Sequence, residues 1–249
     1  MAQKIVFLDA GHGGADPGAV DTKANDPIYS REATYNLDLV AKTKAALERC
    51  GVKVIASRLT DATLSLQKRA ELANKSGANV FVSWHCNGGP DGATSRGIEV
   101  FNYYKSVNGA KLANAIYGRL DDVSPWSDRG VKEAGFYVLK YTKMPATLIE
   151  AGFINNTQEE AALASPTYRL ALAEAAARGI CEYLGVTYKA AVPVVTGPPT
   201  NKPRTFLEAR IHLDATDRAH YVAAAKVKND FIVFYPTVAD SFMEWPKGI

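Results

Sequence analysis

Short apolar runs alternate with longer segments of helical period along residues 1–187. The runs of strand length are KIVFLDA, VKVIAS, ANVFVSW, GIEVFNYY, FYVLK and ATLIEA. Apolar positions at helical spacing predict helices over residues 31–49, 65–76, 106–122 and 167–184. Because strands and helices alternate, the sequence predicts an α/β fold with a central, mostly parallel sheet flanked by helices.

A proline-rich stretch separates this part of the chain from a short tail. The segment AAVPVVTGPPTNKP contains four prolines and neither period, which is typical of an extended linker. We therefore expect a main domain at 1–187, a linker at 188–203 and a small α+β module at 204–249. The module is expected to hold a strand near 207–213, a helix near 216–227 and a second strand, DFIVFYP. Its small size favours packing on the main domain or self-association.

Composition and charge exclude several classes of protein. The chain has 249 residues, of which 47% are hydrophobic and 22% charged, as in a globular protein with one sizeable core. The net charge of +3 is spread thinly and forms no basic stripe, so no nucleic-acid partner is expected. No run approaches the roughly 20 apolar residues of a membrane span, so no membrane partner is expected either.

The cysteines and the amino terminus bear on where the protein is made. Three scattered cysteines do not form a disulfide scaffold, and reduced thiols fit best. The first apolar run is much shorter than the roughly 7–15 residues of a secretory signal. We expect a protein made in the cytoplasm without a signal peptide, which reaches any external substrate by another route.

Four polar side chains stand at the ends of predicted elements. His12 follows the first strand in a GHGG turn, His85 closes ANVFVSW and Glu150 closes ATLIE, whereas Glu32 falls in the first turn of a helix with Ser30 as its expected N-cap. Ligands bind at the carboxyl edge of such sheets. Two histidines, a carboxylate ligand and a spare carboxylate are the set that a zinc hydrolase needs: three ligands and a base.

Three of these four residues also have a plainer interpretation. Acidic residues favour first helical turns because of the helix dipole, which alone accounts for Glu32. The glycine-rich turn around His12 is also compatible with phosphate binding, although it lacks the lysine of a Walker loop. His85, at the end of a strand expected to be buried on both faces, is compatible with a hydrogen-bonded residue at the rim of the core.

Three further residues bear on the chemistry of the site. Cys86, next to His85, raises the alternative of a thiol nucleophile, although adjacent strand residues point to opposite faces. Glu99, in the apolar strand GIEVFNYY, is a rival base. Asn87 either binds a substrate amide or caps the turn after the strand.

Several separated motifs together resemble one known family. LDAGHGGADPGA, REATYN, TLSLQKRAELAN, FVSWHCN, RGIEVFNYY and PATLIEAGFINN are similar to motifs of the zinc-dependent N-acetylmuramoyl-L-alanine amidases of bacterial cell-wall turnover and phage lysis. The resemblance covers roughly residues 4–184 in the family's order. It implies a Zn²⁺ cofactor held by His12, Glu32 and His85, with Glu150 as the catalytic glutamate. It also implies peptidoglycan as the substrate, cut between muramic acid and L-alanine.

Two other functions remain open at this point. A zinc peptidase that cuts within the stem peptide needs the same ligands, and a wall-binding protein without catalysis needs only a structural metal. The module at 204–249 is expected to bind a secondary cell-wall polymer or to form homo-oligomers. A wall hydrolase without an export signal is typical of a phage endolysin, or of an enzyme released when a mother cell lyses.

Overall fold

The computed structural model describes residues 3–21, 29–90, 94–126, 129–191, 226–228 and 231–233. Contacts divide the chain into two compact units, Met1–Ala190 and Ala191–Ile249. Among the helices of the described residues, none has the length and apolar character needed to cross a bilayer.

The first unit is built on a six-stranded sheet with the order β2-β1-β3-β6-β4-β5. Its strands are β1 (Ile5–Ala10), β2 (Lys53–Ala56), β3 (Val80–Asn87), β4 (Glu99–Asn102), β5 (Val131–Glu133) and β6 (Ala146–Phe153). All neighbouring strands run parallel except β4 and β6, which are antiparallel. The expected mostly parallel sheet is confirmed.

Helices cover both faces of this sheet. They are α1 (Glu32–Arg49), α2 (Leu66–Lys75), α3 (Val107–Asp121), α4 (Tyr137–Tyr141), α5 (Thr157–Ala164) and α6 (Pro166–Leu184). The four helices predicted from periodicity are confirmed. Serine N-caps explain two of the starts, since the hydroxyls of Ser65 and Ser106 accept hydrogen bonds from the backbone N–H groups of Lys68 and Gly109.

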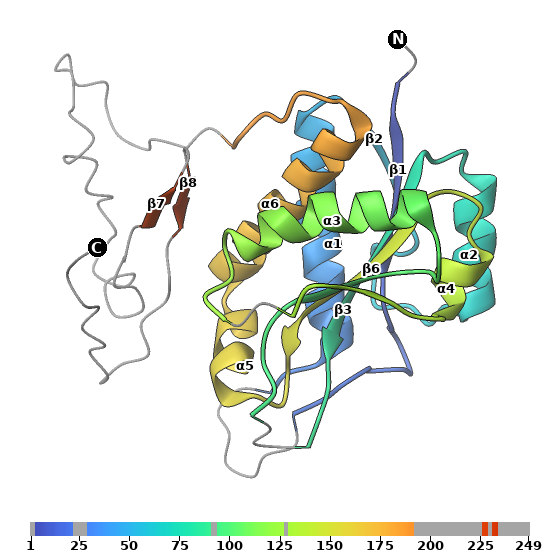
Figure 1. Ribbon diagram of the computed structural model, residues 1–249. Helices are drawn as coiled ribbons and strands as arrows, with labels where there is room; N and C mark the ends of the chain where they lie inside the picture. The colour runs from blue at the N-terminus through green and yellow to red at the C-terminus, as the bar shows by residue number, and fades with distance from the viewer. Residues whose placement is uncertain are drawn as a thin grey trace, which may run out of the picture. The chain divides into compact units, whose positions relative to one another are not determined.

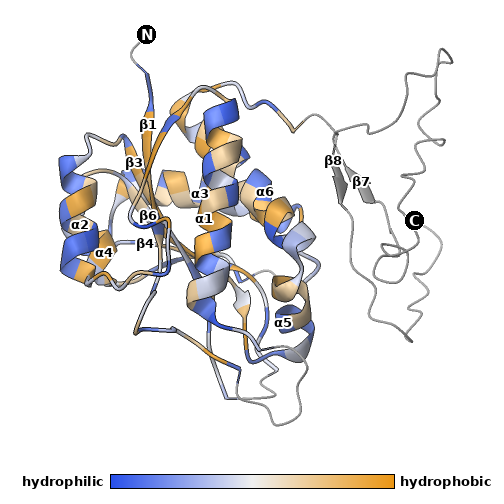
Figure 2. Ribbon diagram, turned by 180° about the vertical axis from the view of Figure 1, so that it is seen from behind, coloured by the Kyte–Doolittle hydropathy of each residue, from blue (hydrophilic) through white to orange (hydrophobic). Residues whose placement is uncertain are grey.

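Two layers of apolar packing hold the sheet. Helices α1, α3 and α6 lie on one face, and α2 and α4 lie on the other (Figure 1). Against the second face, Phe7, Phe81 and Leu148 form a cluster with Val138 and Leu139 of α4. In Figure 2 the hydrophobic colour gathers on the central strands and on stripes of the helices, which is the pattern expected of a sheet buried on both faces.

Two details of the first unit differ from the prediction. The run FYVLK was expected to form a strand, and this prediction is wrong. The run forms helix α4, whose Val138 and Leu139 are both buried. So short an apolar run does not distinguish a strand from a helix. Strand β5 was not predicted, because VKE carries no apolar alternation and pairs only at the sheet edge with β4.

In the second unit, two short strands are described. Strand β7 (Lys226–Lys228) pairs antiparallel with β8 (Phe231–Val233). Strand β8 lies within the expected strand DFIVFYP. The prediction of a helix near 216–227 is wrong at its carboxyl end, because residues 226 and 227 belong to β7 and pair with β8. The rest of that predicted helix and the strand predicted near 207–213 lie outside the described residues.

Candidate metal centre

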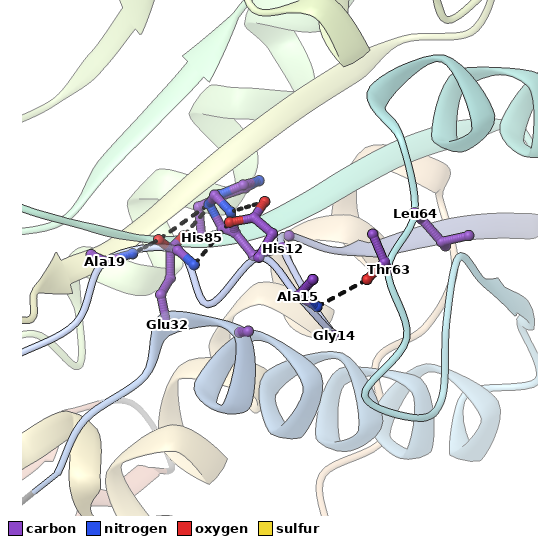
Figure 3. A network of polar contacts seen from close by, with 12 residues as sticks. His12, Gly14, Ala15, Ala19, Glu32, Thr63, Leu64 and His85 are labelled. Carbon is purple, nitrogen blue, oxygen red and sulfur yellow. Dashed lines mark hydrogen bonds and ion pairs between the residues drawn. The ribbon is translucent and has the colours of Figure 1, made fainter.

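His12, Glu32 and His85 converge from three elements (Figure 3). Each offers a ligand atom, and these atoms all lie within 4.8 Å of one another. Glu32 bridges the two imidazoles: its Oε2 lies 3.2 Å from His12 Nε2 and its Oε1 lies 2.9 Å from His85 Nδ1. Of the described residues, this is the one group of three whose donor atoms are arranged to share a metal ion.

The turn after β1 presents His12 in an unusual backbone conformation. His12 has a φ of 58°, a left-handed value that few non-glycine residues adopt and that is often found at functional sites. The Oδ2 atom of Asp16 lies 2.8 Å from His12 Nδ1 and fixes the ring, so that Nε2 faces Glu32. Burial alone would lower the pKa of His12, but the carboxylates of Glu32 and Asp16 outweigh it and raise that pKa.

Two buried arginines hold the backbone of this turn. Arg69 of α2 pairs with Asp9 at 2.7 Å and donates to the carbonyl oxygens of Ala10 and His12. Arg58 donates to the carbonyl oxygens of Ala10 and Gly11. Because both side chains are nearly inaccessible to solvent, these hydrogen bonds are shielded and fix the turn rigidly.

Backbone donors of the turn are already used, which argues against a phosphate cradle. The N–H of Gly14 donates to Asp61 Oδ1, and the N–H of Ala15 donates to Thr63 Oγ1 (Figure 3). The N–H of Gly18 donates to Asp16 Oδ1. A phosphate site needs such N–H groups to point at the ligand, so the phosphate interpretation of the GHGG turn is not supported.

Glycines allow the close approach of the ligand side chains. A Cβ atom at Gly11 would lie 2.3 Å from His85 Cε1, and one at Gly18 would lie 2.4 Å from Glu32 Oε2. Gly18 also has a φ of +68°. Both positions therefore require glycine, since any side chain would displace His85 or Glu32.

Glu32 is the first residue of α1 and is buried. The expected N-cap is wrong: Arg31 occupies the cap position without a side-chain bond, and the hydroxyl of Ser30 instead bonds that of Tyr35. Instead of capping the helix, Glu32 accepts hydrogen bonds from the backbone N–H groups of Ala19 and Cys86. Burial would raise the pKa of Glu32, but hydrogen bonds from the two histidines hold that pKa far below its usual range.

His85, Glu150 and Glu99 occupy one row across the sheet. His85 of β3 is in register with Glu150 of β6, which is in register with Glu99 of β4. Residues paired in this way project from the same face. The prediction that His85 and Glu150 end their strands is wrong, because β3 continues to Asn87 and β6 continues to Phe153. The pairing of these two strands becomes irregular after His85.

One oxygen of the Glu150 carboxyl group lies without a hydrogen bond in the part of the chain that is described. Its Oε2 is buried and has no hydrogen-bond partner in the described part of the chain. Burial, reinforced by the negative charges of Glu32 and Glu99, raises the pKa of Glu150 well above its usual range. A buried, unpaired carboxyl group is costly and is characteristic of a group with a chemical role.

Glu99 and Asn87 lie beside this row with different partners. Glu99 is buried and forms ion pairs with Arg129 and, at 2.6 Å, with Lys132. Both carboxylate oxygens of Glu99 are engaged in these ion pairs, which weakens Glu99 as a rival base. The side-chain amide of Asn87 donates to Glu99 Oε1 at 3.3 Å.

Cys86 is buried and contacts helix α1. Its Sγ lies 3.7 Å from Asn36 Oδ1 of α1, although its backbone N–H donates to Glu32. Burial, together with the nearby charges of Glu32 and Glu150, raises the pKa of the Cys86 thiol well above its usual value. A reactive cysteine needs a lowered pKa and access to the substrate, so the thiol-nucleophile alternative is not supported.

A comparison with protein families matches residues 6–182 to the family described as N-acetylmuramoyl-L-alanine amidase. This chain belongs to that family. The endolysin of Bacillus phage SPP1 is 38% identical over 194 residues, covering 75% of this chain and 68% of that protein. The N-acetylmuramoyl-L-alanine amidase LytC of Bacillus subtilis is 34% identical over 182 residues, covering 72% of this chain but only 35% of LytC.

A solved amidase structure has the same fold. The crystal structure of N-acetylmuramoyl-L-alanine amidase from Clostridium difficile 630 matches this chain with a TM-score of 0.69 and a sequence identity of 36%. The match covers 74% of this chain and 97% of that chain. The six-stranded sheet with its flanking helices is therefore the fold of this amidase family.

Some residues around the centre of this amidase-family fold were not singled out from the sequence. Asp16 lies in the same GHGGADPG string as His12, and its position four residues later was a usable signal. Arg69 lies in the QKRAELAN string but touches the turn after β1 only through tertiary contact. Arg129 and Lys132 come from a stretch without a recognisable period.

Proposed function

We propose that this chain hydrolyses the amide bond between N-acetylmuramic acid and L-alanine in peptidoglycan, with Zn²⁺ as its cofactor. The observation that carries the proposal is the convergence of His12, Glu32 and His85 in a chain of the amidase family. We further propose these three residues as the zinc ligands and Glu150 as the catalytic residue.

The donor set fits zinc. Two imidazole nitrogens and one carboxylate are common ligands of catalytic zinc sites, which keep a further position open. Tetrahedral ligands at the usual zinc distances of about 2.0–2.2 Å stand about 3.3–3.6 Å apart. The contacts of Glu32 with the two histidines, 3.2 and 2.9 Å, are somewhat shorter than that spacing. The bond from Asp16 to His12 Nδ1 is the usual support of a metal-binding histidine.

The residues of the row divide the chemistry between them. When bound, zinc would polarise the scissile carbonyl group and make water a better nucleophile at neutral pH. Glu150 would take the proton from the attacking water and pass it to the leaving amine nitrogen. Its raised pKa suits a group that must both accept and release a proton. Asn87, at the end of β3, is proposed to orient a substrate amide.

The second unit has a separate proposed role. We propose a main domain at 1–187, a linker at 188–203 and a module at 204–249 that binds a secondary cell-wall polymer or joins two copies of the chain. The division of contacts at Ala190 supports two separate units. Sedimentation of the full-length chain and of residues 1–189 alone, each with and without purified walls, separates wall binding from self-association.

Delivery to the wall is proposed to follow release from the host cell. The similarity to a phage endolysin supports a role in lysis. A zinc peptidase that cuts within the stem peptide remains the alternative activity, because it would use the same ligands.

The proposal is tested with purified cell-wall sacculi and the full-length chain. Zinc content is measured by atomic emission, and peptide release is followed for the wild type and for Glu150→Gln. We expect about one zinc per chain in both proteins and peptide release only by the wild type. Zinc-loaded wild type that releases no peptide would contradict the proposed function.

A further inference from the structure

A pair of cations stands beside the row of His85, Glu150 and Glu99. Lys132 on β5 is in register with Phe101 of β4, two residues after Glu99, and therefore lies on the same face of the sheet as Glu99 and Glu150. Arg129 comes from the segment just before β5, and its Nε bonds Glu99 Oε1.

The two cations remain accessible while the carboxylate that holds them is buried. The side chain of Glu99 is only 6% exposed, whereas those of Arg129 and Lys132 are 31% and 39% exposed. Among the described residues, both cations form ion pairs with Glu99 alone. Two partly exposed positive side chains thus contact one buried carboxylate, on the strand next to that of the proposed catalytic residue.

Arg129 is held in place with its donors free for a ligand. Its guanidinium carbon lies 5.0 Å from the centre of the Phe153 ring at the end of β6, and its Nε is engaged by Glu99. The terminal nitrogens form no hydrogen bond within the described part of the chain, and a guanidinium uses this pair of nitrogens to bind a carboxylate in a bidentate manner. A cation fixed before binding loses little entropy when a ligand arrives.

We propose that Arg129 and Lys132 form a subsite for a carboxylate of the peptide stem, beyond the amide that is cut. This inference rests on the peptidoglycan amidase function proposed above. Neighbouring strands lie about 4.8 Å apart, so β4 is about 10 Å and β5 about 14 Å from β3, which carries His85. An extended peptide advances roughly 3.3–3.6 Å per residue. The recognised carboxylate therefore lies about three residues from the scissile bond, on an acidic residue that follows the alanine.

Two synthetic muropeptides test the subsite. They are identical except that the third residue beyond the scissile bond carries a free carboxylate in one and a carboxamide in the other. For the full-length wild type, we expect KM to be about tenfold lower for the carboxylate substrate, with similar kcat. Arg129→Gln and Lys132→Gln should each raise KM for the carboxylate substrate, by up to about tenfold, and leave the carboxamide substrate within about twofold.

Controls separate charge recognition from folding. Lys111→Gln removes an exposed cation from α3 and should leave both substrates unchanged. Removing a cation leaves the buried Glu99 with one partner fewer, so Arg129→Gln is also made together with Glu99→Gln. That double variant should show the same selective rise in KM for the carboxylate substrate.

The outcomes distinguish the subsite from the activity itself. If the wild type cuts both muropeptides with equal KM, or if the Arg129 variants affect both equally, the subsite is overturned and the amidase function stands. If zinc-loaded wild type cuts neither muropeptide, the proposed function fails and the subsite with it. A preference for the carboxylate substrate that weakens at high salt supports the subsite, because exposed charges are screened.

Discussion

Glu150 lies directly opposite His85 in the pairing of β6 with β3, and its buried Oε2 has no hydrogen-bond partner among the described residues. One strand therefore carries a proposed metal ligand, and the adjacent strand carries an unpaired acid on the same face. This arrangement supports the proposal that Glu150 acts beside the metal site without serving as a ligand.

Replacing Glu150 with glutamine should separate chemistry from metal binding. The side chain keeps its size but loses its acid group, so we expect zinc content to stay unchanged while turnover falls by about a hundredfold or more. Peptide release from sacculi and zinc content, measured on the same sample, check this. A Glu150→Gln protein with near-normal turnover would move the role of the base to Glu99, whose glutamine variant is the matched comparison.

Asp16 should control zinc affinity through His12. Loss of its hydrogen bond to Nδ1 frees the imidazole to rotate, and substitutions of such supporting residues typically weaken metal binding about 10–100-fold. Asp16→Asn retains an acceptor for the same bond and should lose less affinity than Asp16→Ala. Competition with a chromogenic chelator measures both values. Equal affinity of Asp16→Ala and the wild type would show that Asp16 does not orient the ring.

The metal-free protein should lose stability as the pH rises above neutrality. The pKa of His12 is raised above its ordinary value of 6.5, so its contribution is complete below that pH and is lost as the pH passes through the raised value. The pKa of Glu32 is lowered, so its contribution is lost only in strong acid, as the pH falls through that lowered value. Bound zinc should reverse the trend for His12, because protons compete with the metal.

Thermal melting across pH 6 to 9, with and without a chelator, measures this difference. His12→Gln is the control and should lack the decline of the chelated wild type. A chelated wild type with the same pH profile as His12→Gln would contradict the account of His12.

Arg69 should be essential to the turn that carries His12. Its removal leaves Asp9 buried without its cation and frees the carbonyl oxygens of Ala10 and His12. Breaking a buried ion pair from one side typically costs about 3–5 kcal/mol in the free energy of unfolding. Urea unfolding of Arg69→Gln measures the loss, and Asp9→Asn combined with Arg69→Gln should recover part of it. No recovery would mean that the carbonyl contacts, not the ion pair, dominate.

The sequence predicted the long elements of this fold and the meeting of its site residues. The period of α1 and α6 is sustained over many residues. His12 follows β1 and His85 lies near the end of β3, and these two strands are parallel, so their carboxyl ends meet at one edge of the sheet. Short or edge elements were missed because their patterns are ambiguous, as for α4 and β5. Contacts such as that of Arg69 with Asp9 or of Arg129 with Glu99 join residues that are far apart in the sequence, and no local sequence pattern predicts them.

The most direct measurement is the identity of the termini released from purified sacculi by the full-length chain. The account predicts new amino termini on alanine, identified by mass spectrometry, which disappear with a chelator and return when zinc is added. New termini within the stem peptide, or release that persists after zinc is removed, would contradict it.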